Sequence, residues 1–321
     1  MQLIEAVPNI SEAQNAQTLA QILGDVQAAA GNVRLLHADS NADANRTVLT
    51  LAGAPQAVVQ ACFLLFKTCT QYIHMQFHQG AHPRLGAVDV CPLVPVRGIT
   101  LAETAIYADR LARRVAEELQ IPIYLYEANA TTPERKNLAF IRQGGYESLQ
   151  KKLKTLPPDY GPNGFSEDVM RTGASVIGAR NFLIAFNVSL HTKDVQAARE
   201  IAAKLRAANG GLPGVKALGW YMPGYGCAQV SFNVTDYHKS NLHNVFEACK
   251  QAAAARGLHV TGSELIGLVP QDALVNAGKF YAPDETDANA LINAAVEHLL
   301  LNNIRPFVVS ERVLEKRLLI D

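Results

Sequence analysis

Three histidines recur at intervals of four residues within a short stretch of the chain. They are His74, His78 and His82, and the last is followed directly by Pro83, Arg84 and an apolar run. An imidazole titrates near neutral pH, so a histidine suits either general acid–base catalysis or metal binding. The spacing therefore allows three interpretations: a metal site, ordinary loop histidines, or a general base.

The metal reading requires the three imidazoles to share one face of a helix. We expect Gly80 and Pro83 to end any helix before His82, and Asp89 lies further on, in a predicted strand. We therefore predict no metal. Pro83 favours an extended backbone at His82, which suits a base aimed from a rigid loop. This reading singles out His82 and leaves the other two as loop residues.

A second polar cluster occupies residues 37–46. Asp39 ends one predicted strand, and Asn45 and Arg46 begin the next. Aspartates in such loops commonly form turns, and Asp43 fits that role. Asp39 could instead face the loop of His82 and orient its imidazole, as a carboxylate does in histidine-based catalytic sites.

A glycine- and proline-rich segment, residues 157–174, is the main irregular part of the chain. The chain contains neither GxGxxG nor GxxxxGK[ST], so this segment is not a recognisable nucleotide-binding loop. It fits either a lid that clamps a ligand or a plain linker between domains.

The composition narrows the class of protein. The 321 residues include 29 basic and 29 acidic side chains, and no basic block predicts a nucleic-acid partner. We expect no signal peptide and no membrane span. Five cysteines without a CxxC pair indicate reduced thiols, and hence a cytoplasmic protein.

The elements that would position these residues follow a repeated pattern. Alternation and helical periodicity predict β-α-β-β-α-β twice, which is the order of a split βαβ or ferredoxin-like unit. We predict an α/β protein of the α+β type, with two such subdomains, 1–177 and 178–321, whose mixed sheets pack against helices. A ligand cleft would lie between the two modules.

Capping signals and the tail give more local predictions. Ser11 with Gln14, and Thr100 with Glu103, have capping-box spacing at the start of two predicted helices. The tail is predicted to form a helix at about 287–302 and a terminal strand from 308.

The chain resembles the glutamate formimidoyltransferase family, whose domain also occurs fused to a cyclodeaminase. The similar segments run in the family's order over nearly the whole chain: EAVPNISE (5–12), NRTVLTLAG (45–53), HPRLGAVDVCPLVPVRGIT (82–100), IPIYLYEA (121–128), RKNLAFIRQGGYESL (135–149), PDYGP (158–162), TGASVIGARNFLIAFNVSL (172–190), GLPGVKALGWYM (211–222), AQVSFNVTDY (228–237) and GSELIGLVP (262–270). No segment similar to the cyclodeaminase is expected in this chain.

The resemblance implies transfer of a formimidoyl group from N-formimidoyl-L-glutamate to N5 of tetrahydrofolate, in histidine degradation. It implies two α/β subdomains with folate between them, a homodimer, and tetrahydrofolate as a co-substrate without a metal. The family's catalytic histidine falls on His82.

The resemblance also implies a set of binding residues. The family's folate-binding segment falls on 161–173, which includes Gly161, Pro162, Phe165 and Gly173. Both substrates are anionic, and guanidinium binds carboxylate in a fork. Arg46 and Arg84, with Asn45 beside them, are therefore predicted to bind substrate, and Arg97 and Arg180 are further candidates.

The chain departs from the family's pattern at four positions close to His82 or to the predicted site: Ala13, His74, Phe77 and Ala81. These departures keep two alternatives open. One is formyl transfer between glutamate and folate, and the other is a folate-binding homologue without catalytic activity.

Overall fold

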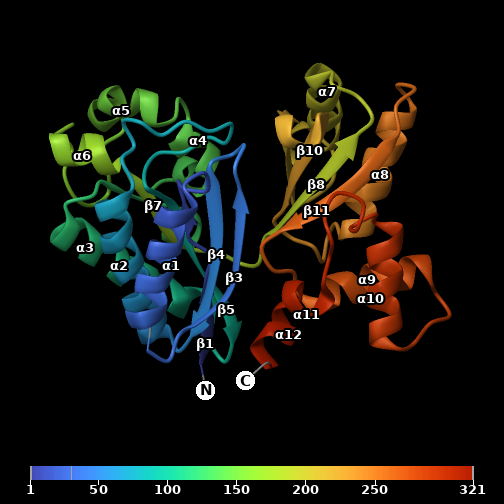
Figure 1. The fold of residues 1–321 in the computed structure, drawn as a ribbon, viewed down its shortest axis with the longest axis horizontal. Coiled ribbons are helices and arrows are strands. Elements are labelled where there is room, and N and C mark those ends of the chain that lie inside the picture. The colour runs from blue at the N-terminus through green and yellow to red at the C-terminus, as the bar shows by residue number, and fades with distance from the viewer. Residues whose placement is uncertain (1, 30, 320–321) are drawn as a thin grey trace. The chain divides into compact units, whose positions relative to one another are not determined.

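The computed structural model describes residues 2–29 and 31–319. The chain forms two compact units, Met1–Asn181 and Phe182–Asp321. The prediction of an α/β protein with sheets packed against helices is confirmed in both units (Figure 1).

The N-terminal unit is built on one mixed sheet. Its strands lie in the spatial order β3-β4-β1/β2-β5-β7-β6, with β7 parallel to both β5 and β6 and the other pairs antiparallel. Pro8 separates β1 from β2, and both pair with β4 and β5. The bounds are β1 Leu3–Ala6, β2 Asn9–Ile10, β3 Arg34–Asn41, β4 Arg46–Gly53, β5 Val88–Arg97, β6 Ile123–Leu125 and β7 Ser175–Ala179.

Three long helices pack on one face of this sheet (Figure 1). They are α1 Ala16–Ala29, α2 Pro55–Tyr72 and α3 Leu101–Leu119. Pro55 suits the first turn of α2 because the missing N–H has no intrahelical acceptor there. The predicted capping box of Thr100 and Glu103 is confirmed.

Shorter helices supply a second core against strands β5, β6 and β7. They are α4 Leu138–Arg142, α5 Leu149–Thr155 and α6 Glu167–Thr172. Ile141 of α4 is fully buried there with Val90 of β5 and Val176 of β7. Segment 133–174 is therefore part of the packed unit, and the prediction that 157–174 is irregular misses α6.

The C-terminal unit has the predicted β-α-β-β-α-β order, and its sheet is wholly antiparallel in the order β11-β8-β10-β9. The first four strands of the N-terminal unit have the same relative order when β1/β2 count as one strand. The bounds are β8 Ile184–Leu190, α7 Val195–Leu205, β9 Val215–Met222, β10 Cys227–Val234, α8 Leu242–Ala254, β11 Val260–Ile266, α9 Gln271–Tyr281, α10 Ala288–His298, α11 Val309–Arg312 and α12 Leu314–Leu319. Single 3₁₀ turns occur at η1 Glu127–Asn129, η2 Glu134–Lys136, η3 Tyr146–Ser148, η4 Ala207–Asn209 and η5 Pro223–Tyr225.

Two local predictions are wrong. Ser11 does not cap α1: its hydroxyl donates to Gly86 O at 2.8 Å, and Asn15 instead accepts from Thr18 N at the helix start. The predicted terminal strand is two short helices, α11 and α12, and its only strand-like contact in the described residues is an isolated bridge between Val313 and Val269.

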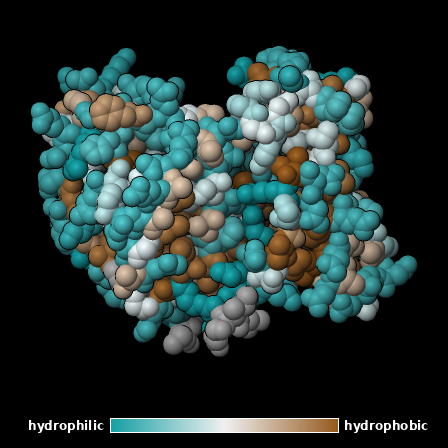
Figure 2. Space-filling view, viewed as in Figure 1, coloured by the Kyte–Doolittle hydropathy of each residue, from teal (hydrophilic) through white to brown (hydrophobic). Residues whose placement is uncertain are grey.

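The visible surface is mostly hydrophilic, with apolar residues in small groups (Figure 2). Within residues 2–29 and 31–319, no helix is both long and apolar enough to cross a membrane.

Gly173 gives a stability prediction. Its φ is +72°, and an added Cβ would collide with Leu85 O and Gly86 Cα. Alanine in this backbone region costs about 1–3 kcal/mol before any clash, so Gly173→Ala should lower the free energy of unfolding by roughly 2 kcal/mol or more. Gly164→Ala is the matched control, because nothing lies within 4 Å of its added Cβ. Equal urea midpoints for the two variants would contradict this role of Gly173.

Candidate active site

His82 lies in the loop between α2 and β5, and its ring is half-buried. Its Nδ1 lies 2.7 Å from Pro83 O. A carbonyl oxygen only accepts, so Nδ1 carries the proton and the lone pair is on Nε2. The following proline thus supplies the acceptor that sets the tautomer of His82, which leaves Nε2 as the basic atom.

The loop that carries His82 is fastened to the turn between β3 and β4. Asn45 donates from Nδ2 to Gln79 O at 2.9 Å and accepts from Ala13 N at 2.9 Å. Ala81 N donates to Asp43 O at 3.0 Å. Asn45, predicted to bind substrate, is therefore used to hold the loop in place.

Both ring nitrogens of His78 make hydrogen bonds to other residues. Its Nε2 donates to Asn45 O at 2.9 Å, and its Nδ1 accepts from Arg84 Nε at 3.0 Å. Burial lowers the pKa of His78, which favours the neutral ring that these two bonds require. Both ring nitrogens are committed, so His78 is a supporting residue and not a base.

Arg84 is similarly committed to protein acceptors. Its remaining hydrogen bonds run to His78 O at 3.0 Å and to Glu147, whose carboxylate lies 2.7 Å from Nη2. Its backbone oxygen accepts from Tyr146 N at 2.8 Å. Arg84 therefore joins the His82 loop to the segment that follows α4, and substrate binding by Arg84 stays a prediction.

A buried carboxylate, Asp89, lies at the centre of the charged groups near His82. Its Oδ2 accepts from Arg46 Nη1 at 2.6 Å and from Arg142 Nη2, and its Oδ1 accepts from Leu85 N at 2.9 Å and Arg142 Nε at 3.2 Å. Arg46 is also held by Asn9 Oδ1, which accepts from Nη2 at 2.6 Å. One carboxylate thus fixes two guanidinium groups.

The cluster formed by Asp89, Arg46 and Arg142 carries a net positive charge. Burial opposes ionisation of Asp89, but Arg142 and Arg46 more than offset it and lower the pKa of its carboxyl. Burial, and then the charges of Arg46 and Arg142, hold the pKa of His82 well below its usual value. Two cations and one anion beside a neutral imidazole form a site suited to an anionic ligand.

Asp39 occupies a buried position on β3, paired in register with Val48 of β4. Its Oδ2 lies 3.8 Å from His37 Nε2. The orientation of His82 by Asp39 stays a prediction.

The predicted folate-binding segment contributes both backbone and side-chain packing. Gly161 has φ +85° and faces Ile121 O, and Gly173 forms a bridge with Gly86. Phe165 packs on Tyr146, with ring centroids 6.5 Å apart. Pro162 is half-buried in the same turn. Through Tyr146, this segment is continuous with Arg84 and the His82 loop.

The sequence-based reading missed three contributors: Asn9, Asp89 and Arg142. Asp89 was considered only as a metal ligand, and Arg142 lies within one of the segments that carry the family resemblance, 135–149. No local spacing links them, because Asp89 and Arg142 are 53 positions apart in the chain.

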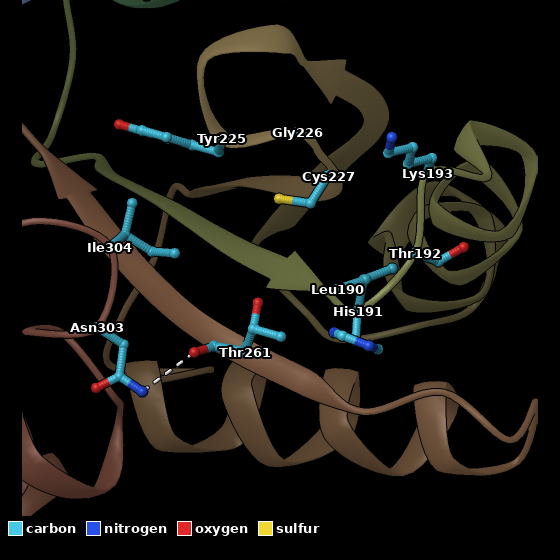
Figure 3. Close-up of a pocket in the computed structure, with 10 residues that line it drawn as sticks. All are labelled: Leu190, His191, Thr192, Lys193, Tyr225, Gly226, Cys227, Thr261, Asn303 and Ile304. Atoms are coloured by element: carbon cyan, nitrogen blue, oxygen red, sulfur yellow. Dashed lines mark hydrogen bonds between the residues drawn. The ribbon is translucent and has the colours of Figure 1, made fainter.

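Two surface cavities differ in their relation to this site. One of about 400 Å³ in the N-terminal unit is lined by Asn45, His74, Phe77 and His78 among others. The other, of about 550 Å³, belongs to the C-terminal unit and contains no predicted site residue (Figure 3). Its wall includes Asn303, whose amide donates to Thr261 O at 3.1 Å.

In the described part of the chain, no group of three or more His, Cys, Asp or Glu side chains could hold a metal ion.

Comparison with known proteins identifies similarity along both units. Residues 3–180 match the model of the formiminotransferase domain, N-terminal subdomain, and residues 185–319 match that of the formiminotransferase domain. A glutamate formimidoyltransferase of Streptococcus pyogenes serotype M1 is 40% identical over 87% of this chain and 93% of its own. One from Thermoplasma acidophilum is 38% identical over 88% and 92%. The mouse formimidoyltransferase-cyclodeaminase is 42% identical over 98% of this chain, which spans 59% of the mouse protein's length.

The electrostatics of His82 can be measured directly. Burial and the two arginine charges favour its neutral ring, so we expect its NMR titration midpoint to lie below 6.5. Arg142→Gln removes one of the charges that lower this pKa and should move the midpoint upward. The ring signals are assigned by their loss in His82→Asn, and a midpoint at or above 6.5 in the unaltered protein would refute the assignment.

Proposed function

The chain belongs to the formiminotransferase domain family, and we propose that it transfers the formimidoyl group of N-formimidoyl-L-glutamate to N5 of tetrahydrofolate. The products are 5-formimidoyltetrahydrofolate and L-glutamate, and the reaction belongs to histidine degradation. Support comes from two relatives named glutamate formimidoyltransferase, each similar over most of its length. Tetrahydrofolate takes part as a co-substrate.

The reaction requires one proton to move between two nitrogens. N5 of the folate attacks the imine carbon of the formimidoyl group and forms a C–N bond. His82 Nε2 takes the N5 proton from the tetrahedral intermediate. The protonated ring then gives a proton to the glutamate nitrogen as its bond to that carbon breaks, so one histidine acts as base and then as acid.

The hydrogen bond from His82 Nδ1 to Pro83 O carries this assignment. It sets the lone pair on Nε2, and burial, followed by the charges of Arg46 and Arg142, lowers the pKa of His82 and so favours the neutral ring that a base needs. His78, the neighbouring candidate, has both nitrogens occupied by Asn45 O and Arg84 Nε.

The proposal also covers a residue that positions His82, the folate-binding segment, the oligomeric state and the cellular compartment. Asp39 would orient the imidazole of His82. Segment 161–173 would bind folate, with Gly161, Pro162, Phe165 and Gly173. The family resemblance supports a homodimer. Four of the five free cysteines are buried, which suits a reducing compartment such as the cytoplasm.

Two positions at which the chain departs from the family's pattern line the same cavity as Asn45. His74 and Phe77 line the cavity beside Asn45, and Phe77 is 81% exposed. Formyl transfer involving N-formylglutamate is therefore assayed beside the formimidoyl reaction. Turnover with N-formylglutamate alone would replace the proposed donor, and binding of folate without turnover would indicate a non-catalytic homologue.

Replacing His82 tests its role in proton transfer. With tetrahydrofolate and formimidoylglutamate, His82→Asn should lower kcat by about a hundredfold or more, the usual range for loss of a general base. His74→Asn is the matched control, because His74 is exposed on the same loop. Similar kcat values for the two variants would show that His82 is not the base.

Folate binding is tested separately from turnover. A ligand that binds only the folded state raises Tm by mass action. Saturating 5-formyltetrahydrofolate should therefore raise the Tm of the unaltered protein and of His82→Asn by similar amounts. Absence of a shift in both would reject the assignment of a folate site, whereas loss of the shift only in His82→Asn would make His82 a binding residue.

A further inference from the structure

We infer that Arg142, held beside Arg46 by Asp89, binds a carboxylate of the glutamate part of the donor and thereby sets the enzyme's preference for an acidic donor. The inference rests on the proposed function and assigns a specificity role to a residue that lies 53 positions from its partner Asp89.

The hydrogen bonds of Arg142 leave part of its guanidinium available. Nε and Nη2 both donate to Asp89, and within the described residues Nη1 has no protein acceptor. Nη1 is not among the buried polar atoms that lack a partner, and the Arg142 side chain is 13% exposed. The group is thus fixed on one edge and open to a ligand on another, as a bidentate carboxylate site requires.

Asp89 cannot neutralise both arginines. Its oxygens already accept from Arg46, Arg142 and Leu85 N, and the side chain is fully buried. One positive charge therefore remains in the cluster when His82 is neutral. A ligand carboxylate would balance this charge and complete the hydrogen bonds of the open guanidinium edge.

The position of the pair beside His82 ties this carboxylate site to the reacting centre. The charges of Arg46 and Arg142 both act on the His82 ring. Arg84, which lies in the same loop as His82, already makes hydrogen bonds or ion pairs with Glu147 and His78. Arg142 is therefore the better candidate for contact with the donor.

The sequence of α4 explains how Arg142 is presented. Ile141 is completely buried in the second core of the N-terminal unit, which anchors the last turn of the helix. Arg142 follows it and reaches Asp89 at the start of β5. A buried neighbour and a bidentate ion pair together restrict the guanidinium to one position, so little side-chain entropy would be lost on binding.

Donor analogues test this role. The assay compares N-formimidoyl-L-glutamate with its α-amide and its γ-amide, which keep the shape but remove one carboxylate charge each. For the unaltered protein, kcat/KM should fall by about 10- to 100-fold with one of the two amides, as expected for loss of a charge-assisted hydrogen bond.

Arg142→Gln should raise KM for formimidoylglutamate by about 10- to 100-fold on the same grounds, with a much smaller change in kcat and in the KM for tetrahydrofolate. The preference for glutamate over that amide should then nearly vanish. Arg142→Lys keeps the charge without the fork and should lie between the two. A purely structural role would lower kcat/KM equally for all three donors, and an unchanged preference in a folded variant overturns the inference.

Arg113→Gln serves as the control, since Arg113 is an exposed arginine of α3 paired with Asp109. Its KM values and donor preference should stay unchanged. If Arg142→Gln does not fold, Arg142→Lys decides the question. If the unaltered protein transfers nothing, the proposed function fails, and calorimetry with L-glutamate then tests the inference alone. Weaker binding by Arg142→Lys than by Arg113→Gln supports it, and equal binding overturns it.

Discussion

One buried carboxylate bridging two arginines is the constraint on which the region around His82 depends. Asp89 is fully buried, and removing one partner of such a pair typically costs about 3–5 kcal/mol. The same carboxylate accepts from Leu85 N, close to the His82 loop. Arg46 arrives from β4 and Arg142 from α4. Asp89 thus ties two separate elements to the strand that follows the histidine.

Hydrogen bonds and an ion pair from two sides of the loop fix the positions of His82 and its neighbours. Asn45 holds the loop from one side, and Arg84 with Glu147 holds it from the other. His78 lies between them and uses both ring nitrogens. His82 differs from His78 because its neighbour Pro83 supplies the acceptor for Nδ1. The acceptor is a backbone carbonyl that any residue at position 83 would supply, whereas the proline ring restricts the backbone that holds it.

The sequence predicts local order well and long-range pairing poorly. The capping box of Thr100 and Glu103 forms as predicted, because both residues lie within the first turn of one helix. Ser11 also has a capping spacing, yet its hydroxyl donates to Gly86 O, 75 positions away. The same limit applies to the site. The loop geometry of His82 can be argued from Pro83, whereas the pairing of Asp89 with Arg142 exists only after the second core has formed.

The two units show how one topology can be used in two ways. The fourth strand of each ferredoxin-like pattern carries a buried carboxylate, Asp89 on β5 and Glu264 on β11. Glu264 accepts from the neutral groups of Asn187, Gln229 and Tyr225, and Arg305 Nε lies 3.5 Å from its Oε2. Two guanidinium groups, those of Arg305 and Arg312, donate to Leu265 O, the carbonyl next to this carboxylate. Asp89 instead forms ion pairs with two guanidinium groups, which leaves a positive charge for an anionic ligand. Arg142 supplies the second guanidinium from segment 133–174, which follows β5 and β6 in the chain.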